Sequence, residues 1–145
     1  MELERRTPRF RTVFSVTAGD CHHAADTEDP TVPGYGEHLP FHSILQRCGV
    51  AWRSYLVELL PADLGVIVPR VNADFLAEIH LGRMEIAVAV SGIGTTSFTL
   101  ICEVTQEGTL AARVTVVLVN FDYRSRSAVP LSREQRTALE AASGS

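Results

Sequence analysis

The stretch Pro40–Leu60, PFHSILQRCGVAWRSYLVELL, decides the fold that we predict for this chain. Its apolar residues recur every three or four positions, which is the period of a helix with one buried face. These residues are Phe41, Ile44, Leu45, Cys48, Trp52, Tyr55, Leu56 and Leu59. Pro40 suits the first helical turn, where its missing N–H costs nothing, and Pro61 marks the end of the helix. Because few charges lie along this segment, we expect other structure to wrap around the helix.

The segments on either side of this helix have the composition of strands. One strand is predicted over Phe10–Thr17, where β-branched and aromatic residues predominate. Four more are predicted over Leu64–Ala77, Arg83–Gly92, Thr96–Glu103 and Ala111–Asp122. Short turn signals separate these four strands, which favours antiparallel neighbours, and a short helix is predicted over Ser132–Ala141. The expected fold class is α+β, with one antiparallel β-sheet wrapped around a long central helix.

The length of 145 residues predicts a single domain over residues 1–145, large enough to bury a full core. Residues 1–8 are charged, and we expect them to be frayed. The segment Ala18–Glu37 is dense in glycine, proline and aspartate without any period, so we predict a long loop inserted in the domain.

Composition excludes several classes of protein. The net charge of −4 argues against non-specific nucleic-acid binding, and no apolar run approaches the ~20 residues that cross a bilayer. The charged start of the chain predicts no signal peptide, and three scattered cysteines suit a reducing compartment. We therefore expect a cytoplasmic protein with no nucleic-acid or membrane partner. Every basic residue is an arginine, so phosphate recognition would use arginine forks or backbone N–H groups.

Six short motifs follow one another in an order and spacing similar to those of one known family. Ala18–His22 (AGDCH) resembles the G-D-x-D sequence that ends the first strand of that family. Gly36–His42 (GEHLPFH) resembles its x-x-G-H-V-N-N entry into a central helix. The other motifs are Val71–Gly82, Ile93–Phe98, Asn120–Tyr123 and Ala128–Leu131. The family is that of the hotdog-fold acyl-CoA thioesterases of the 4-hydroxybenzoyl-CoA thioesterase type, and the likeness runs from about Phe10 to Leu139.

This resemblance implies a hotdog fold and a hydrolase that acts on acyl-CoA or on an acyl carrier protein. We expect no cofactor apart from the coenzyme A of the substrate, and no metal site, because the sequence offers no second pair of metal ligands. The resemblance also implies a homodimer or homotetramer, with two sheets joined edge to edge and the active site at the subunit boundary.

The chain departs from the family at the position of its usual catalytic carboxylate. The second aspartate of G-D-x-D is the nucleophile or general base in the family, and His22 occupies that position here. An inserted stretch then precedes the helix-entry motif, in which the Gly-His of the family has become Glu37-His38. The fold assignment is unaffected, but the inherited catalytic residue is lost.

Thioester hydrolysis needs a polarised carbonyl group and an activated water molecule or nucleophile. The free N–H groups at the start of the central helix, around Phe41–Ser43, favour the developing oxyanion. For water activation we predict a cluster at this helix end. Its candidate members are His22, Glu37, His38, Asp20 and His42.

Each candidate has a simpler interpretation. Asp20 could be a turn residue that bonds the nearby backbone, and His22 could be an exposed residue of a loop. Glu37 could act only through its interaction with the helix dipole. His38 and His42 are four residues apart and invite a metal interpretation, but Pro40 places His38 outside the helix, so the two rings need not share a face. Cys48 lies on the apolar stripe, where a thiol is usually inert.

Substrate-binding candidates lie at the helix start and in two later segments. Phe41 and Ser43 would contact the thioester, while Thr96 and Ser97 would offer turn N–H groups to the pantetheine or phosphates. Phosphate forks would come from Arg83, Arg124 and Arg126. The alternative for these arginines is a solvated surface cluster.

Two further functions fit the same fold. Hotdog domains include dehydratases and hydratases, which use a histidine with an acidic residue to move a proton beside a thioester. Because His22 stands in the usual carboxylate position, the domain could also bind an acyl chain without turnover.

Overall fold

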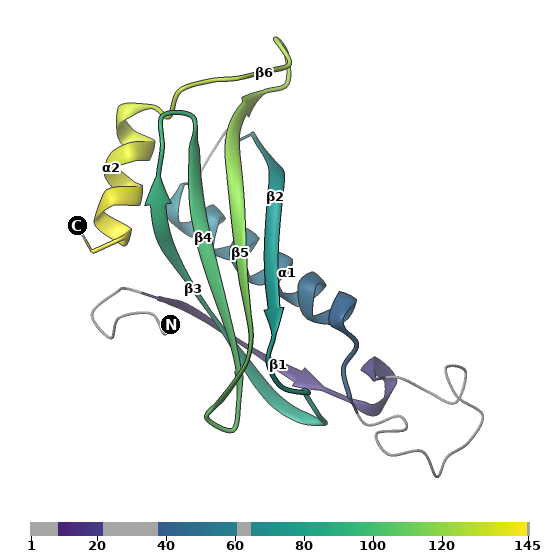
Figure 1. The fold of residues 1–145 in the computed structure, drawn as a ribbon. Helices are drawn as coiled ribbons and strands as arrows, with labels where there is room; N and C mark the ends of the chain where they lie inside the picture. The colour runs from purple at the N-terminus through teal and green to yellow at the C-terminus, as the bar shows by residue number, and fades with distance from the viewer. Residues whose placement is uncertain (1–8, 22–37, 61–64, 145) are drawn as a thin grey trace.

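A computed structural model of the chain describes residues 9–21, 38–60 and 65–144. Figure 1 shows one sheet with a long helix, α1, across one of its faces and a shorter helix, α2, beside it. In chain order the elements are β1 (Phe10–Val16), the 3₁₀ turn η1 (Ala18–Asp20), α1 (Phe41–Leu59), β2 (Val66–Phe75), β3 (Gly82–Ile93), β4 (Ser97–Gln106), β5 (Thr109–Asp122), β6 (Ser127–Ala128) and α2 (Arg133–Ala142).

The strands form an antiparallel sheet in the order β1-β3-β4-β5-β2, and β6 adds a short pairing to β5. One row of partners crosses the whole sheet, and its members are Phe10, Val88, Cys102, Val114 and Ala73. The three central members of this row are fully buried, so this face of the sheet forms the core. Because β1 and β2 lie at the two edges, each has one side without a strand partner among the described residues.

The helix α1 packs its apolar stripe on β3, β1 and β4. Its buried residues are Ile44, Cys48, Ala51, Trp52, Tyr55 and Leu56. These fall at helical spacing and confirm the predicted helix, although Pro40 is the N-cap and lies just outside the first turn. The described strands also agree with the five predicted strands within a few residues at each end, and β6 is an addition.

The sheet covers one side of α1, in agreement with the predicted arrangement, but the outer side of the helix stays open within the single chain. Val57 on its outward face is 73% exposed, and Val50, one heptad earlier, is also exposed. A sheet and a helix form two layers, and two layers cover only one side of the helix. The small number of charged residues in α1 therefore does not mean that all sides of the helix are buried within this chain.

The predicted loop Ala18–Glu37 begins with a short ordered turn, η1, and residues 22–37 lie outside the described residues. At the other end of the chain, α2 packs on β3 and α1. It starts with a capping box, in which Ser132 and Gln135 exchange side-chain-to-backbone hydrogen bonds. Arg136 anchors the helix further by donating a 2.7 Å hydrogen bond to the carbonyl oxygen of Gly94.

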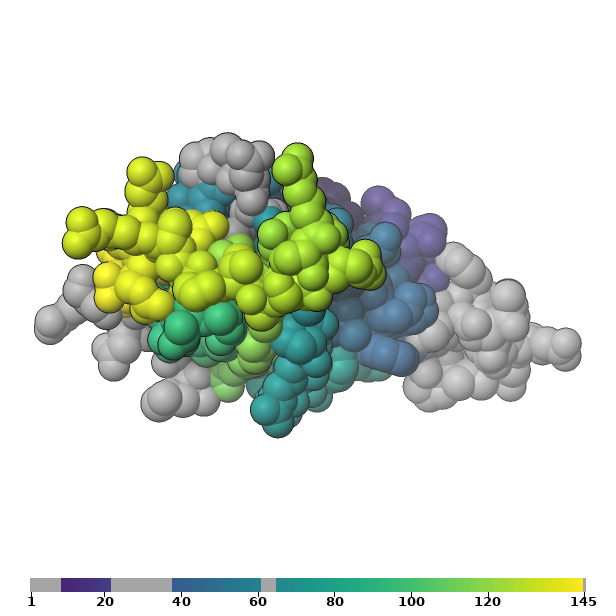
Figure 2. Space-filling view, turned by 90° about the horizontal axis from the view of Figure 1, so that it is seen from above, coloured from purple at the N-terminus to yellow at the C-terminus, as the bar shows by residue number. Residues whose placement is uncertain are grey.

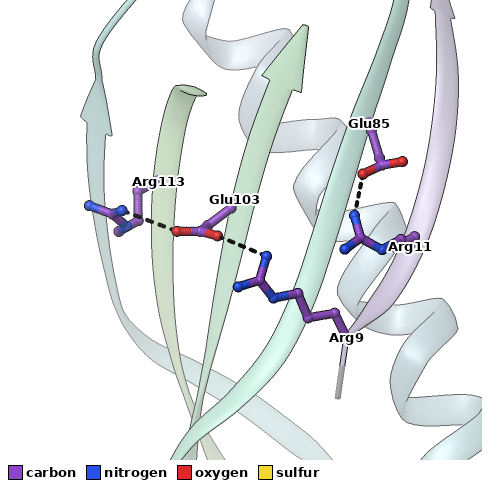
Figure 3. A network of polar contacts seen from close by, with 5 residues as sticks. All are labelled: Arg9, Arg11, Glu85, Glu103 and Arg113. Atoms are coloured by element: carbon purple, nitrogen blue, oxygen red, sulfur yellow. Dashed lines mark hydrogen bonds and ion pairs between the residues drawn. The ribbon is translucent and has the colours of Figure 1, made fainter. Parts of the chain in front are cut away.

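The face of the sheet opposite α1 carries a charged network (Figure 3). Glu103 on β4 is nearly buried and lies between Arg113 at 3.1 Å and Arg9 at 3.6 Å. Since β3 separates β1 from β4, the Arg9 side chain must cross β3 to reach Glu103. Arg11 and Glu85 form a second, exposed pair on the same face.

Candidate active site

The start of α1 exposes backbone donors. Pro40 at the N-cap offers no side-chain hydrogen bond, and its carbonyl oxygen accepts from the N–H groups of Ser43 and Ile44. The N–H groups of Phe41 and His42 have no backbone partner among the described residues. Of the three residues expected to supply free N–H groups, Ser43 has its N–H group already paired with Pro40. The N–H groups of Phe41 and His42 remain as the two candidate donors to a substrate oxygen.

A pocket of about 340 Å³ lies beside this helix start. Its apolar lining comes from Leu39, Phe41, Ile44, Phe75, Leu76 and Ile79. Leu39 and Ile79 are buried, whereas Phe41, Phe75 and Leu76 are exposed at its rim. The rings of Phe41 and Phe75 meet edge to face at 5.9 Å, so an aromatic pair borders the pocket.

The polar side chains of this pocket are His38 and Glu78. His38 Nδ1 lies 3.7 Å from Glu78 Oε2, and the backbone N–H of Leu39 donates a 2.8 Å hydrogen bond to the carbonyl oxygen of Ile79 next to them. Sequence reasoning missed Glu78. No local signal identifies it, because its partner lies before α1 and the contact exists only after β2 has joined the sheet.

Asp20 lies in η1 and is engaged with its neighbours. The backbone N–H and the hydroxyl of Thr17 donate hydrogen bonds to it at 2.8 and 2.9 Å, and Arg47 of α1 approaches to 3.1 Å. The two Thr17 hydrogen bonds, followed by the Arg47 charge, lower the pKa of Asp20 below its ordinary value. The carboxylate thus joins the end of β1 to α1.

The remaining catalytic candidates are His42, His22 and Glu37. His42 is exposed on the first turn of α1, and its ring meets that of Phe41 at 5.7 Å. His22 and Glu37 fall outside the described residues, so their catalytic role stays a prediction. The structure therefore places His38, Phe41 and His42 at one helix end.

The phosphate-binding candidates are divided between two places. Thr96 lies in the β3–β4 turn and Ser97 begins β4, while Arg124 and Arg126 lie in the β5–β6 turn. Both turns are at the end of the sheet opposite the start of α1, and Figure 2 views the molecule from that end, with the β5–β6 segment on the surface. A hydrogen bond from the N–H of Asn120, near the end of β5, to the Thr96 carbonyl oxygen links the β3–β4 turn to the strand that leads into the β5–β6 turn.

Arg83 does not join these arginines. It lines a separate open cleft of about 630 Å³ at the other end of the sheet, together with Glu85 and Glu107. Glu85 already pairs with Arg11 there. Within one chain, Arg83 therefore lies far from both Arg124 and Arg126.

Two kinds of feature are absent from the described residues. No three of their histidine, cysteine or acidic side chains gather where they could hold a metal ion. None of the helices within residues 9–21, 38–60 and 65–144 is both long and apolar enough to cross a membrane.

Solved structures similar to this chain include several thioesterases. A Thermus thermophilus thioesterase complexed with coenzyme A and zinc is 25% identical, with a TM-score of 0.78 and 98% of each chain covered. A Staphylococcus aureus protein in complex with coenzyme A is 13% identical, with a TM-score of 0.79, over 99% of this chain and 89% of that one. A 1,4-dihydroxy-2-naphthoyl-CoA thioesterase from Synechocystis is 21% identical, with a TM-score of 0.70, over 90% of this chain and 95% of that one.

These likenesses confirm the predicted hotdog fold. No curated protein matches the chain. The sequence profile of the thioesterase-like superfamily matches residues 16–139, which run from the end of β1 into α2. The chain therefore belongs to the thioesterase-like superfamily.

Proposed function

We propose that this chain is an acyl-CoA thioesterase whose reaction takes place at the start of α1. Its superfamily gives the reaction class, which is thioester hydrolysis. One observation carries the proposal: the uncapped start of α1 presents two backbone donors beside a pocket that contains His38. The coenzyme A bound by the Thermus thermophilus and Staphylococcus aureus proteins favours coenzyme A as the carrier.

In the proposed reaction the thioester carbonyl oxygen accepts hydrogen bonds from the N–H groups of Phe41 and His42. The His38 imidazole takes a proton from water, and the hydroxide oxygen forms a bond to the carbonyl carbon. Negative charge develops on the carbonyl oxygen, where the helix donors and dipole stabilise it. The C–S bond then breaks, and the imidazolium returns its proton to the departing thiolate. His22 and Glu37 are the alternative bases.

We also propose a homodimer joined through β2. This edge strand carries exposed apolar side chains, which are Ile67, Val68, Val71 and Phe75. An edge strand of this kind is a template for pairing with another strand. A two-fold axis beside β2 would join two sheets into one continuous antiparallel sheet.

This dimer would complete the site. The start of α1 lies near the Phe75 end of β2, whereas Arg124 and Arg126 lie near its Val66 end. Antiparallel pairing of β2 with its symmetry copy sets the Phe75 end of one protomer beside the Val66 end of the other. Each pocket would then have the two arginines of the partner subunit within reach of the substrate phosphates.

The first test is hydrolysis of a panel of acyl-CoA thioesters, with straight-chain and aromatic acyl groups, measured as release of free thiol. We expect turnover with at least one of them, and a matched acyl carrier protein thioester tests the alternative carrier. His38→Ala should lower kcat by about 10²–10⁴-fold, the usual contribution of a general base. His22→Ala and Glu37→Ala test the alternative bases, and Glu140→Gln on α2 is the control.

Three results would contradict this proposal. The enzyme assignment fails if no substrate of the panel releases thiol above background. Addition of water to an enoyl-CoA without thiol release would instead identify a hydratase. If hydrolysis persists undiminished in His38→Ala, the base is misassigned even though the reaction is correct.

The second test concerns the dimer. Val71→Lys places a charge on the β2 edge and should yield monomers in light scattering. Val13→Lys is the matched control, because Val13 lies on the opposite edge strand and both valines are 47% exposed. A dimer that survives Val71→Lys but dissociates in Val13→Lys would place the interface on β1.

A further inference from the structure

We infer that Glu78 is the positioning residue of His38, so that the two side chains form a histidine–carboxylate dyad beside the start of α1. This inference rests on the proposed function, because it assigns a role in the same site. It adds a residue that lies outside the helix-entry motif and that the sequence did not single out.

The contact joins two segments that are held rigidly against each other. His38 Nδ1 lies 3.7 Å from Glu78 Oε2. The residue after each of them takes part in the 2.8 Å hydrogen bond from the Leu39 N–H to the Ile79 carbonyl oxygen. The side chains of Leu39 and Ile79 are both buried in the core. The backbones that carry His38 and Glu78 are therefore fixed, and only the rotamers of the two side chains remain to be set.

The solvent exposure of the His38 and Glu78 side chains argues against a stabilising role for their contact. The His38 side chain is 30% exposed and the Glu78 side chain 61%. An ion pair with this much solvent contributes little to stability. The separation of 3.7 Å is slightly longer than a hydrogen bond, and a small rotation of the exposed Glu78 side chain would bring its carboxylate to Nδ1. A carboxylate bonded there would decide which ring nitrogen carries the proton.

A carboxylate at Nδ1 selects the tautomer that general-base catalysis needs. With the hydrogen on Nδ1 and directed at Glu78, the lone pair of the neutral ring is on Nε2. Nε2 can then take the proton of the attacking water, and the charge that forms on the ring is balanced by the Glu78 carboxylate. The same proton later passes from Nε2 to the thiolate leaving group, so Glu78 ends the cycle unchanged.

A second histidine near Glu78 supplies a sharp control. His80 and Glu78 line a smaller cleft of about 210 Å³ together with Glu107. If Glu78 acted through His80, removal of the His80 ring would have the effect that we assign to His38. The backbone groups of His80, rather than its ring, bond the Gln106 side chain, so His80→Gln leaves these bonds in place.

The direct test is the tautomer of His38 in ¹⁵N-labelled protein, read by long-range ¹H–¹⁵N NMR at a pH where the ring is neutral. His38→Gln identifies the signal. We expect the Nδ1–H form in the wild type, a change towards the Nε2–H form in Glu78→Gln, and no change in His80→Gln. An Nε2–H ring in the wild type, or a tautomer that Glu78→Gln leaves unchanged, would overturn the inference.

Kinetics give an independent readout. Glu78→Gln should lower kcat roughly tenfold, with KM unchanged, as expected for the loss of a group that orients a histidine. Glu78→Asp should recover part of this loss. In a His38→Ala background, Glu78→Gln should have no further effect, because the dyad acts as a unit.

The two proposals fail in different ways. If no thioester is hydrolysed, the proposed function is lost, while the tautomer measurement still decides whether the dyad exists. If hydrolysis occurs and the losses from His38→Ala and Glu78→Gln multiply, Glu78 does not act through His38. A large loss in Glu78→Gln alone, with His38→Ala fully active, would make Glu78 itself the base and would overturn the positioning role.

Discussion

The backbone N–H of Leu39 donates a 2.8 Å hydrogen bond to the carbonyl oxygen of Ile79, and this contact joins the residues before α1 to the segment after β2. It closes one side of the pocket and brings His38 beside Glu78. Pro40 follows directly and begins the helix without a side-chain cap. The position of the candidate active site thus depends on a buried junction as well as on α1.

Truncation of Ile79 should damage both stability and activity. Ile79 is completely buried, so Ile79→Ala leaves a cavity and should cost about 2–5 kcal/mol of unfolding free energy. Urea denaturation measures this loss, and kcat should also fall because the junction that holds His38 loosens. Val13→Ala on the exposed edge strand β1, outside the proposed dimer interface, is the control and should cost less than about 1 kcal/mol. Equal costs for the two variants would contradict this account of the junction.

Removal of the Asp20 charge should destabilise the protein in a pH-dependent way. The hydrogen bonds from Thr17, and then Arg47, lower the pKa of Asp20 below its ordinary value of 3.8. A lowered pKa contributes stability that is present above the ordinary value and is lost as the pH falls through the folded-state value. Asp20→Asn should therefore be less stable than the wild type at neutral pH, and the urea midpoints should converge in acid. A difference that stays constant down to low pH would contradict this.

The two glutamates of the outer sheet face should differ strongly in their contribution to stability. The Glu103 side chain is only 6% exposed and lies between Arg9 and Arg113, so Glu103→Gln should cost about 3 kcal/mol by leaving partly buried guanidinium groups without their counter-charge. Glu85→Gln removes a solvent-exposed pair with Arg11 and should cost about 1 kcal/mol or less. Thermal or urea unfolding measures the loss of unfolding free energy in each variant. A similar loss in Glu103→Gln and Glu85→Gln would contradict the expected difference between the buried and the exposed glutamate.

The cysteine thiols should not react in the folded protein. All three are buried, and a hydrogen bond with Cys48, together with burial, raises the pKa of Cys102 well above its ordinary value. Burial likewise raises the pKa of Cys21. Ellman's reagent at neutral pH should therefore modify the thiols only after denaturation. Rapid modification of Cys48 in the native state would contradict its place in the core, and would also add background to the thiol-release assay.

The helix that positions the candidate site could be predicted, because the pattern that identifies a helix depends only on neighbouring residues in the sequence. The helical period of Pro40–Leu60 identified α1, and the free N–H groups at its start follow from the geometry of any helix. The same period placed Cys48 in the core, where the structure finds it buried. Low charge along α1 did not distinguish the covered side of the helix from its open side, since Val57 is exposed although the segment carries few charges.

The amino-acid sequence by itself determined the elements, their order and the superfamily, because helical and strand periods depend on neighbouring residues and on which face is buried. Only the tertiary structure decided which distant residues meet. Glu78 faces His38, Arg83 lies away from Arg124 and Arg126, and Glu103 is enclosed by two arginines. The physical reason is that strand register and the Leu39–Ile79 junction are settled by packing across the whole sheet, and a local pattern carries no record of that packing.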